Sequence, residues 1–342
     1  MDKPDFHAAA RSGSLSQLPA SLLTVENLTA GNASGNTPVH IAAKYGTLDQ
    51  LPAALLTPEV LLIKNDAGFT PLHLAAREGT LDRFPAALLT TDYLLTRSNS
   101  GITPLHQSAA AGTLDQLPPG LLTMELVLTK TTTGDTLLHE AAENGTLDRF
   151  PRQFITHATL TSPNISGETA LHTAALNGHL DQVPREFLTA ATLLLKTTNH
   201  DTCLHAAAIS GHLDQIPPEL LTHENLVLHS KSGHTPIHAA AESGFLRQIP
   251  PDRLTLDLLI SRNDFGDTPL HAAAVEGHLK DVPREFINRA TLTMRNYTGG
   301  TPIGAAIHNG HANQLPEEFR PKPPTIVQKI LYKTGFSRPP FG

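Results

Sequence analysis

The sequence is poor in several residue types, and each shortage excludes some chemistry. Among 342 residues there is one cysteine and no tryptophan, and only 5% of residues are aromatic and 17% charged. The single thiol, Cys203, cannot form an internal disulfide, which suits a reducing compartment. No stretch approaches the ~18 apolar residues of a membrane span, and Met1 to Asp5 lack the charged-then-apolar pattern of a secretory signal. We therefore expect a cytoplasmic protein without a membrane partner.

Basic residues are scarce in the body of the chain. After Glu318 the sequence carries five cationic residues and no acidic one, and removing these five charges from the formal net charge of −7 leaves −12 for residues 1–319. Nucleic acids and anionic membranes bind clustered cations. The acidic body therefore argues against both as partners, while the basic end can be either a solvated tail or a docking patch.

What the sequence does contain is a repeat. His7 and Gly304 stand at the two ends of a series in which a histidine recurs every 33 residues without an insertion, at His40, His73, His106, His139, His172, His205, His238 and His271. A fixed period of this length indicates one supersecondary unit stacked on copies of itself, each burying its apolar face on its neighbours. We therefore predict a single domain with one continuous core.

Each unit opens with the signals of a short helix. In the unit that begins at Gly68, the glycine supplies the positive φ of a tight turn and Thr70 can cap the helix with its hydroxyl. Pro71 then fills the first helical position, and Gly79 ends the helix. The alanine pair that follows the histidine leaves little bulk between neighbouring helices, so these helices can pack closely.

The second half of each unit is interrupted by proline at one offset: Pro19, Pro52, Pro85, Pro118, Pro151, Pro184, Pro217, Pro250, Pro283 and Pro316. A helix cannot run through such a proline, because the ring meets the carbonyl four residues back. A threonine five residues later, such as Thr57, can cap a new helix. We therefore predict a tight turn near the proline and a short second helix capped by threonine.

The block Gly-x-Thr-Pro-Leu-His-x-Ala-Ala-x-x-Gly, seen at Gly35–Gly46, Gly68–Gly79 and Gly266–Gly277, resembles the ankyrin repeat. The resemblance implies an all-α ankyrin-repeat solenoid of about ten stacked units with short capping ends. The units fall near residues 1–33, 34–66, 67–99, 100–132, 133–165, 166–198, 199–231, 232–264, 265–297 and 298–319, and residues 320–342 form a Pro-rich basic C-terminal cap or tail. Within it, residues 325–333 can form a helix, either a closing cap or a partner-binding element.

The repeated histidines and aspartates invite a chemical role, yet their spacing argues against one. Equivalent residues of adjacent units lie one helix spacing apart, ~8–10 Å, whereas each ligand of a zinc ion sits ~2 Å from the metal. The histidine side chain can instead bond the turn backbone. The same geometry applies to a second column of His179, His212, His278 and His311, and to the aspartate column Asp49, Asp82, Asp115, Asp148, Asp181 and Asp214. We predict no catalytic residues, no metal site, no cofactor and no enzymatic activity.

Two sets of residues are candidates for binding. A basic column, Lys64, Arg97, Lys130, Lys196, Arg262 and Arg295, either presents a cationic stripe to an acidic partner or covers aliphatic surface while its charges stay in water. By resemblance, ankyrin arrays bind proteins through the turn tips and the inner face of the first helix. At those variable offsets stand Phe69, Arg77, Ile102, Asp135, Glu143, Glu168, Asp201, His234, Glu242 and Asp267. We expect Phe69 and Ile102 to be exposed.

The resemblance implies a non-enzymatic scaffold that binds a partner protein, itself unidentified, and acts as a monomer. Two other hypotheses stay open. The chain can be an inhibitor that mimics acidic nucleic acid, provided that its acids form one continuous face, or the targeting module of a larger enzyme.

Overall fold

The computed structural model describes residues 4–84 and 86–321. They fall into two compact units, unit 1 up to Asn225 and unit 2 from Leu226 onward, and each unit is described by itself. Every regular element in the described residues is a helix, and successive helices pack on their neighbours in order, which confirms the all-α repeat fold. None of these helices combines the length and the apolar character needed to cross a bilayer. The single array predicted up to residue 319 and the element predicted at 325–333, outside the described residues, stay predictions.

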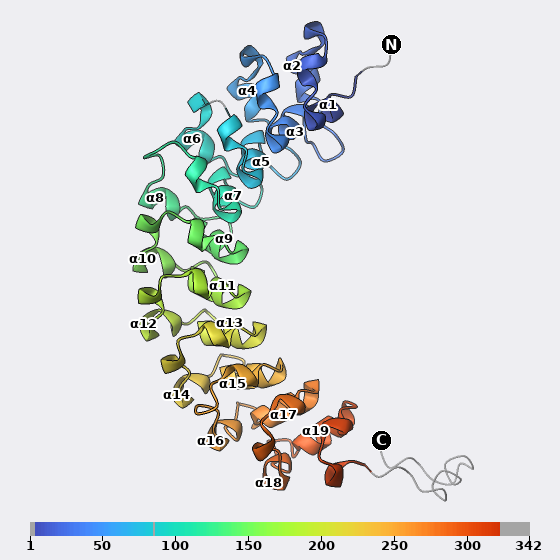
Figure 1. Ribbon diagram of the computed structural model, residues 1–342, viewed down its shortest axis with the longest axis vertical. Coiled ribbons are helices and arrows are strands. Elements are labelled where there is room, and N and C mark those ends of the chain that lie inside the picture. Colours follow the sequence, from blue (N-terminus) through green and yellow to red (C-terminus); the bar gives the residue numbers. More distant parts are fainter. Residues whose placement is uncertain (1–3, 85, 322–342) are drawn as a thin grey trace, which may run out of the picture. The chain divides into compact units, whose positions relative to one another are not determined.

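The first helix of each repeat is the longest element, and within each unit it packs on the first helix of the next repeat (Figure 1). Unit 1 holds α1 (Phe6–Ser12), α3 (Pro38–Tyr45), α5 (Pro71–Glu78), α7 (Pro104–Ala111), α9 (Leu137–Asn144), α11 (Ala170–Asn177) and α13 (Cys203–Ser210), and unit 2 holds α15 (Pro236–Glu242), α17 (Pro269–Glu276) and α19 (Pro302–His308). The paired alanines of most of these helices, such as Ala75 and Ala76, have no exposed surface. Small side chains thus let neighbouring backbones approach closely, as the sequence predicted.

The helix ends follow the predicted local signals. Thr37 Oγ1 accepts a hydrogen bond from the backbone N–H of His40 at 3.3 Å, and His40 Nδ1 accepts one from the N–H of Thr37 at 3.1 Å. This reciprocal capping box satisfies two backbone donors that have no partner inside the helix. At the other end Gly46 has φ 68°, where an L side chain is disfavoured, and its N–H closes the last turn on Ala42 and Ala43.

The second half of each repeat contains more short helical turns than the sequence predicted. One 3₁₀ turn precedes the proline offset, at Leu15–Gln17, Leu48–Gln50, Leu81–Arg83, Leu114–Gln116, Leu147–Arg149, Leu180–Gln182, Leu213–Gln215, Leu246–Gln248, Leu279–Asp281 and Ala312–Gln314. A second follows it in most repeats, at Ala20–Leu22, Ala53–Leu55, Ala86–Leu88, Arg152–Phe154, Arg185–Phe187, Pro218–Leu220, Arg284–Phe286 and Glu317–Phe319. Between them Pro52 has φ −55° and ψ 129°, an extended conformation that ends the first turn.

The predicted second helix is then short. It comprises α2 (Val25–Thr29), α4 (Pro58–Leu61), α6 (Thr91–Leu94), α8 (Met124–Val127), α10 (His157–Leu160), α12 (Ala190–Leu193), α14 (His223–Leu226), α16 (Leu256–Leu259) and α18 (Arg289–Leu292). Threonine caps several of them, for example Thr123, whose Oγ1 accepts from the N–H of Leu126 at 3.3 Å. The restart predicted from the threonine column is therefore confirmed.

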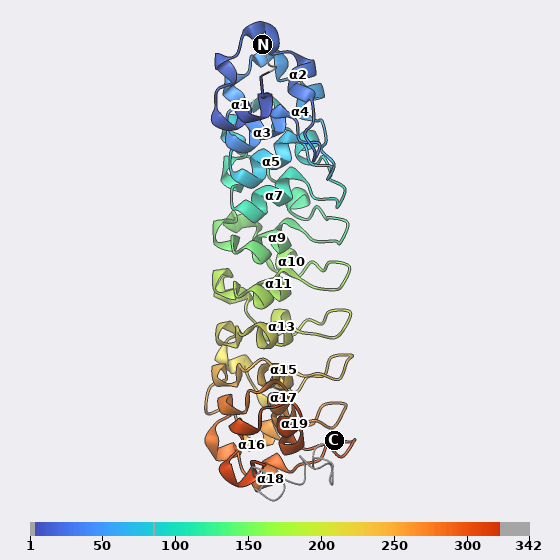
Figure 2. The same cartoon turned by 90° about the vertical axis from the view of Figure 1, so that its right-hand side faces the viewer.

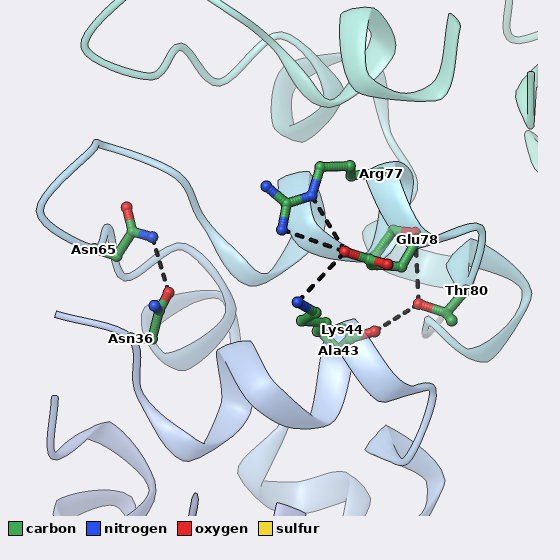
Figure 3. A network of polar contacts seen from close by, with 8 residues as sticks. Asn36, Ala43, Lys44, Asn65, Arg77, Glu78 and Thr80 are labelled. Carbon is green, nitrogen blue, oxygen red and sulfur yellow. Dashed lines mark hydrogen bonds and ion pairs between the residues drawn. The ribbon is translucent and has the colours of Figure 1, made fainter. Parts of the chain in front are cut away.

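Hydrogen bonds from side chains to the neighbouring repeat's backbone join adjacent repeats. Thr80 Oγ1 donates to the carbonyl oxygen of Ala43 at 2.5 Å (Figure 3), and Thr113 donates to Ala76 in the same way at 3.1 Å. His179 stands at the same offset and donates from Nδ1 to Ala142 at 2.8 Å. His179, in the second histidine column, therefore has a structural role, because its ring nitrogen replaces the threonine hydroxyl as the hydrogen-bond donor.

The loops that lead to each first helix project to one side of unit 1 (Figure 2). A backbone hydrogen bond joins each loop tip to the tip before it, as from the N–H of Ile165 to Thr133 at 3.0 Å and from the N–H of Thr198 to Ser166 at 2.8 Å. Asn164 adds a side-chain bond, because its Nδ2 donates to Asp135 Oδ1 at 2.8 Å. The loops therefore form a connected rim beside the first helices.

Candidate functional site

The repeated histidine is held by the backbone through both ring nitrogens. In His40, Nδ1 faces the N–H of Thr37, and Nε2 lies 3.0 Å from the carbonyl oxygen of Phe69 in the next repeat. A backbone N–H can only donate, so Nδ1 accepts, and the ring carries its proton on Nε2, which donates to the carbonyl. His73 and His139 repeat this arrangement. The column therefore links a helix N-terminus to the following loop, the structural role predicted from the sequence.

Burial also determines how these rings titrate. Removal from water lowers the pKa of His73, His106 and His238 to about 4, against a small opposing effect of the carbonyl acceptors. The rings are therefore neutral at pH 7. Among the described residues no group of three His, Cys, Asp or Glu side chains is arranged to hold a metal ion.

The basic column makes contacts that neither sequence interpretation predicted. Four of the six cations reach the backbone at their own offset in the next repeat, whereas Arg295 Nη1 donates to Gly299 in its own loop. Lys64 Nζ donates to the carbonyl of Arg97 at 2.8 Å, and Arg97 Nη1 to that of Lys130 at 2.6 Å. Lys130 continues to Pro163 at 2.6 Å, and in unit 2 Arg262 reaches Arg295 at 2.8 Å. Lys196 is exposed. These side chains act as clamps between repeats, and their donors are directed at the protein's own carbonyls.

A groove runs along the first helices α9, α11 and α13 of unit 1 and the loops before them, with a cavity volume of about 570 Å³. We call it the acidic groove, because its lining contains five carboxylates, those of Asp135, Glu140, Glu143, Glu168 and Asp201, and no lysine or arginine. The helices that supply one side are adjacent in Figure 1. The loop rim supplies the other side.

Aliphatic side chains lie among these carboxylates. Ile165, on the loop rim, is 71% exposed, and Leu176 and Ile209, near the ends of α11 and α13, are 46% and 55% exposed. All three line the acidic groove. The acidic groove thus combines aliphatic surface with its carboxylates.

The carboxylates of the acidic groove are electrostatically coupled. Burial, followed by the nearby charges of Glu143 and Asp135, raises the pKa of Glu140 to about 7. Burial by itself also raises the pKa of Asp135, but hydrogen bonds from Thr133 and Asn164 outweigh it and hold the pKa of Asp135 below its ordinary value. The acidic groove thus keeps negative charge at neutral pH, while one of its carboxyls carries a proton part of the time.

A second groove lies in unit 2, along α15, α17 and α19, with a volume of about 630 Å³. Its lining differs in chemistry, because it combines Phe265 and His308 with only two carboxylates, Glu242 and Asp267. The ring of His234 meets that of Phe265 edge to face at 6.2 Å between centroids. This groove is therefore less acidic and more aromatic than the acidic groove.

Comparison with known protein families identifies two stretches of this architecture. A family model described as ankyrin repeats in three copies matches residues 6–89, and one described as a single ankyrin repeat matches residues 265–297. The chain contains ankyrin repeats. No curated protein sequence matches the chain. Ankyrin repeats are in general protein–protein interaction modules and are typically non-catalytic.

The candidate binding residues predicted from the sequence fall into three groups in the structure. Asp135, Glu143, Glu168 and Asp201 line the acidic groove, and His234, Glu242 and Asp267 line the groove of unit 2, whereas Phe69, Arg77 and Ile102 line neither. Arg77 pairs with the neighbouring Glu78 at 3.3 Å (Figure 3). The expected exposure of Phe69 and Ile102 is wrong, because both are half-buried. The Phe69 ring packs on His73 at 5.3 Å, which explains its enclosure.

Glu140 lines the acidic groove and has a raised pKa, but it was not among the binding residues predicted from the sequence. It follows the repeated histidine directly, at an offset occupied elsewhere by Leu74, Gln107, Thr173 and Ala206. This variability was a usable signal, since an offset that changes its chemistry between repeats is not fixed by packing. It was overlooked because the offset lies inside an otherwise regular helical motif.

Proposed function

We propose that the acidic groove binds a segment of another protein that carries lysine or arginine side chains beside apolar ones. The observation that carries this proposal is one groove in which five carboxylates, without a lining cation, alternate with exposed aliphatic side chains. Leu176 and Ile209 project from helices whose ends are capped and whose other face is buried. Exposed apolar groups on such a rigid surface are typical anchors for a protein partner.

The sign of the charge selects the partner class. Neighbouring carboxylates repel one another, and the pKa of Glu140 is raised first by burial and then by the charges of Glu143 and Asp135. A cationic side chain in the acidic groove relieves the repulsion, whereas a phosphate backbone adds to it. This supports a protein segment, and not a nucleic acid, as the occupant.

We infer recognition, and not catalysis, as the task of the acidic groove. His139 and His172, at its base, direct their ring nitrogens to backbone atoms and to a threonine hydroxyl. The other lining groups include carboxylates, amides, hydroxyls and aliphatic side chains, which suit hydrogen bonding and charge pairing. The protein is thus proposed to be a monomeric cytoplasmic scaffold without enzymatic activity. Acidic nucleic-acid mimicry and a targeting module of a larger enzyme stay hypotheses.

The test uses peptides selected from a random display library on the immobilised full chain, with affinity then measured by fluorescence anisotropy. The selected peptides should be enriched in Lys or Arg spaced by apolar residues. The double variant Glu143→Lys/Glu168→Lys should weaken their binding at least tenfold, and the uncharged variant Leu176→Ser/Ile209→Ser should also weaken it.

The matched control is Asp115→Lys/Asp148→Lys, which makes the same charge change at exposed positions outside the acidic groove. It should bind the peptides as the parent does. Equal losses in both charge variants would mean a general effect of net charge, and unchanged binding in the Glu143/Glu168 variant would refute the proposed site.

A further inference from the structure

We propose that the partner of the acidic groove also carries a stretch of aspartate or glutamate, which binds a second surface of unit 1 formed by Arg11, Lys44 and Arg77. We call these three side chains, in the last turns of α1, α3 and α5, the cationic cluster. The inference rests on the proposed function, because it describes a second part of the same partner. It assigns that partner an order of charges along the first helices.

One offset of the repeat carries both surfaces of unit 1. Along the first helices it holds the cationic cluster on α1, α3 and α5, then Ala110 on α7, Glu143 on α9, Leu176 on α11 and Ile209 on α13. These helices pack on one another in this order (Figure 1), so residues at one offset form a row. No Asp, Glu, Lys or Arg lies in α7, between the two surfaces. A segment that follows the row therefore passes from positive to negative charge.

The side chains of the cationic cluster meet around one aromatic ring and one carboxylate. Arg11 Cζ lies 5.9 Å and Lys44 Nζ 5.6 Å from the centre of the Tyr45 ring, which is exposed. Lys44 Nζ and Arg77 Nη2 lie 3.6 Å and 3.3 Å from the same atom, Glu78 Oε1 (Figure 3). Three positive charges thus share one negative charge, which leaves an excess of positive charge at this surface.

The cationic cluster has donors to spare, unlike the basic column. Lys64 and Arg97 of that column donate to backbone carbonyls of the next repeat. In the cluster Arg11 is exposed, and the side chains of Arg77 and Lys44 are 44% and 33% exposed. A guanidinium has five N–H donors and an ammonium three, so one shared carboxylate cannot occupy them all. Arginine beside an exposed tyrosine is a combination enriched among the residues that dominate protein interfaces.

The nearby acidic groove selects a protein over a nucleic acid as the occupant of the cationic cluster. α5 and α9 are two helix spacings apart, ~16–20 Å, which exceeds the Debye length of about 8 Å at physiological salt. The two surfaces therefore attract opposite charges independently. A nucleic acid that followed the row would bring phosphates to the five carboxylates of the acidic groove. A protein segment can carry both signs of charge and match both surfaces.

The repeat spacing sets the distance between the two parts of the partner. Four helix spacings, about 32–40 Å, separate α3 in the middle of the cationic cluster from α11 in the middle of the acidic groove. A linker of at least about ten to twelve residues is needed to span this distance. Once one part is bound, the other has an effective concentration on the order of millimolar, so a weak second contact raises the affinity at least tenfold.

Two-part peptides test the inference on the full chain. A selected peptide that binds the acidic groove is extended by a Gly/Ser linker of about fifteen residues and four glutamates, at its N-terminus in one peptide and at its C-terminus in another. Matched peptides carry glutamines in place of these glutamates. By fluorescence anisotropy at physiological salt, the glutamate peptide should bind at least tenfold more tightly than the glutamine peptide in one of the two orders.

Changes in the cationic cluster should remove this gain, measured as the ratio of the two affinities. Arg11→Glu/Arg77→Glu reverses two charges. Arg11→Gln/Lys44→Gln/Arg77→Gln only neutralises the cluster, so a folding defect in the reversed variant does not decide the test. The control Arg152→Glu/Arg185→Glu makes the same charge change as the reversal at exposed positions of unit 1 outside both surfaces, and it should keep the gain.

The outcomes separate this inference from the proposed function. Absence of the gain in both orders, or its persistence in both cluster variants, overturns the inference. Tighter binding of a single-stranded oligonucleotide than of the glutamate peptide, lost in the cluster variants, overturns it in favour of a nucleic acid. If the glutamine peptide depends on Glu143 and Glu168 but the glutamates add nothing, this inference fails and the proposed function stands. Both fail if the glutamine peptide does not depend on these two residues and the glutamates add nothing.

Discussion

Acidification should destabilise the repeats through the buried histidine column. His73 and His106 have pKa values of about 4 in the folded chain, because burial disfavours the charged ring, against an ordinary value of 6.5. Between these two values the unfolded chain binds more protons than the folded one, so stability rises with pH. The contribution of the neutral buried rings to stability is complete above about pH 6.5 and is lost progressively as the pH falls toward 4. The geometry agrees, since a proton on Nδ1 would face the backbone N–H that this atom accepts.

The two pKa values give the size of the effect. A shift of 2.5 units corresponds to about 3.4 kcal/mol for each ring once the pH is below 4, and to about 2 kcal/mol at pH 5. His73 and His106 together should therefore lower the free energy of unfolding of their part of unit 1 by about 4 kcal/mol between pH 7.5 and pH 5. Stability differences of this size are a large part of the total for most domains.

Histidine Hε1 chemical shifts in the folded protein measure these pKa values directly, and urea unfolding at pH 7.5, 6 and 5 measures the consequence. His106→Gln identifies one signal and should reduce the pH dependence of unfolding, although the variant is less stable at pH 7.5. His157→Gln, at an exposed position of α10, is the control and should leave the dependence from the buried rings intact. If the His73 and His106 signals titrate near pH 6.5 in the folded chain, the reasoning is refuted.

Three further predictions, two of them with a comparison variant, are tested by thermal or urea unfolding. Ser108 is fully buried in α7, and its hydroxyl has no hydrogen-bond partner among the described residues. Ser108→Ala should therefore stabilise the folded protein by about 1–2 kcal/mol. Ala141→Ser, the reverse change at the same offset of the next repeat, should destabilise it. His200 has φ 64° at a turn position where most repeats have glycine, so His200→Gly should stabilise the folded protein by about 1 kcal/mol. A lower unfolding midpoint in this variant would show that the histidine side chain compensates for the backbone strain. Arg97→Met should lower the free energy of unfolding by about 1 kcal/mol, because it removes two hydrogen bonds to carbonyl oxygens. Arg83→Met removes only an exposed surface ion pair and should change stability by less than about 0.5 kcal/mol. Equal effects of the two substitutions would contradict the role of Arg97 as a clamp between repeats.

Local signals predicted most of the fold because each acts within a few residues. The cap at Thr37, the left-handed glycine at Gly46 and the break at Pro52 depend on backbone conformation alone, and all are found where the sequence placed them. The structural role of the histidine column was also predicted correctly, since the position of the ring after the capping threonine pointed to the turn backbone. The second 3₁₀ turn was missed because short alanine and leucine runs do not distinguish a turn from a helix.

Contacts between different offsets were harder to predict. The reach of Lys64 to the carbonyl of Arg97 depends on the direction of the side chain relative to the stacking axis, which a column of like residues does not reveal. The enclosure of Phe69 depends on how its ring meets His73. Glu140 and Asp201 belong to different repeats and different offsets, yet both line the acidic groove. Periodicity describes each column separately, whereas a groove is a two-dimensional patch made from several columns.

Some offsets of the repeat bond neighbouring repeats and others do not, which explains why the acidic groove is the strongest candidate for a binding surface. Offsets that keep one kind of side chain in most repeats bond the backbone of an adjacent repeat: the histidine bonds a loop carbonyl, the threonine after the helix bonds a second carbonyl and the basic residue bonds a third. These groups are occupied by the stack itself, so substitution there changes stability first. Offsets that vary, such as those of Glu140, Glu143 and Ile209, are not fixed by these bonds, and their side chains line the acidic groove. Charge reversal at Glu143 and Glu168 changes variable offsets and leaves the bonds of the histidine, threonine and basic offsets in place, which is why it can separate binding from stability.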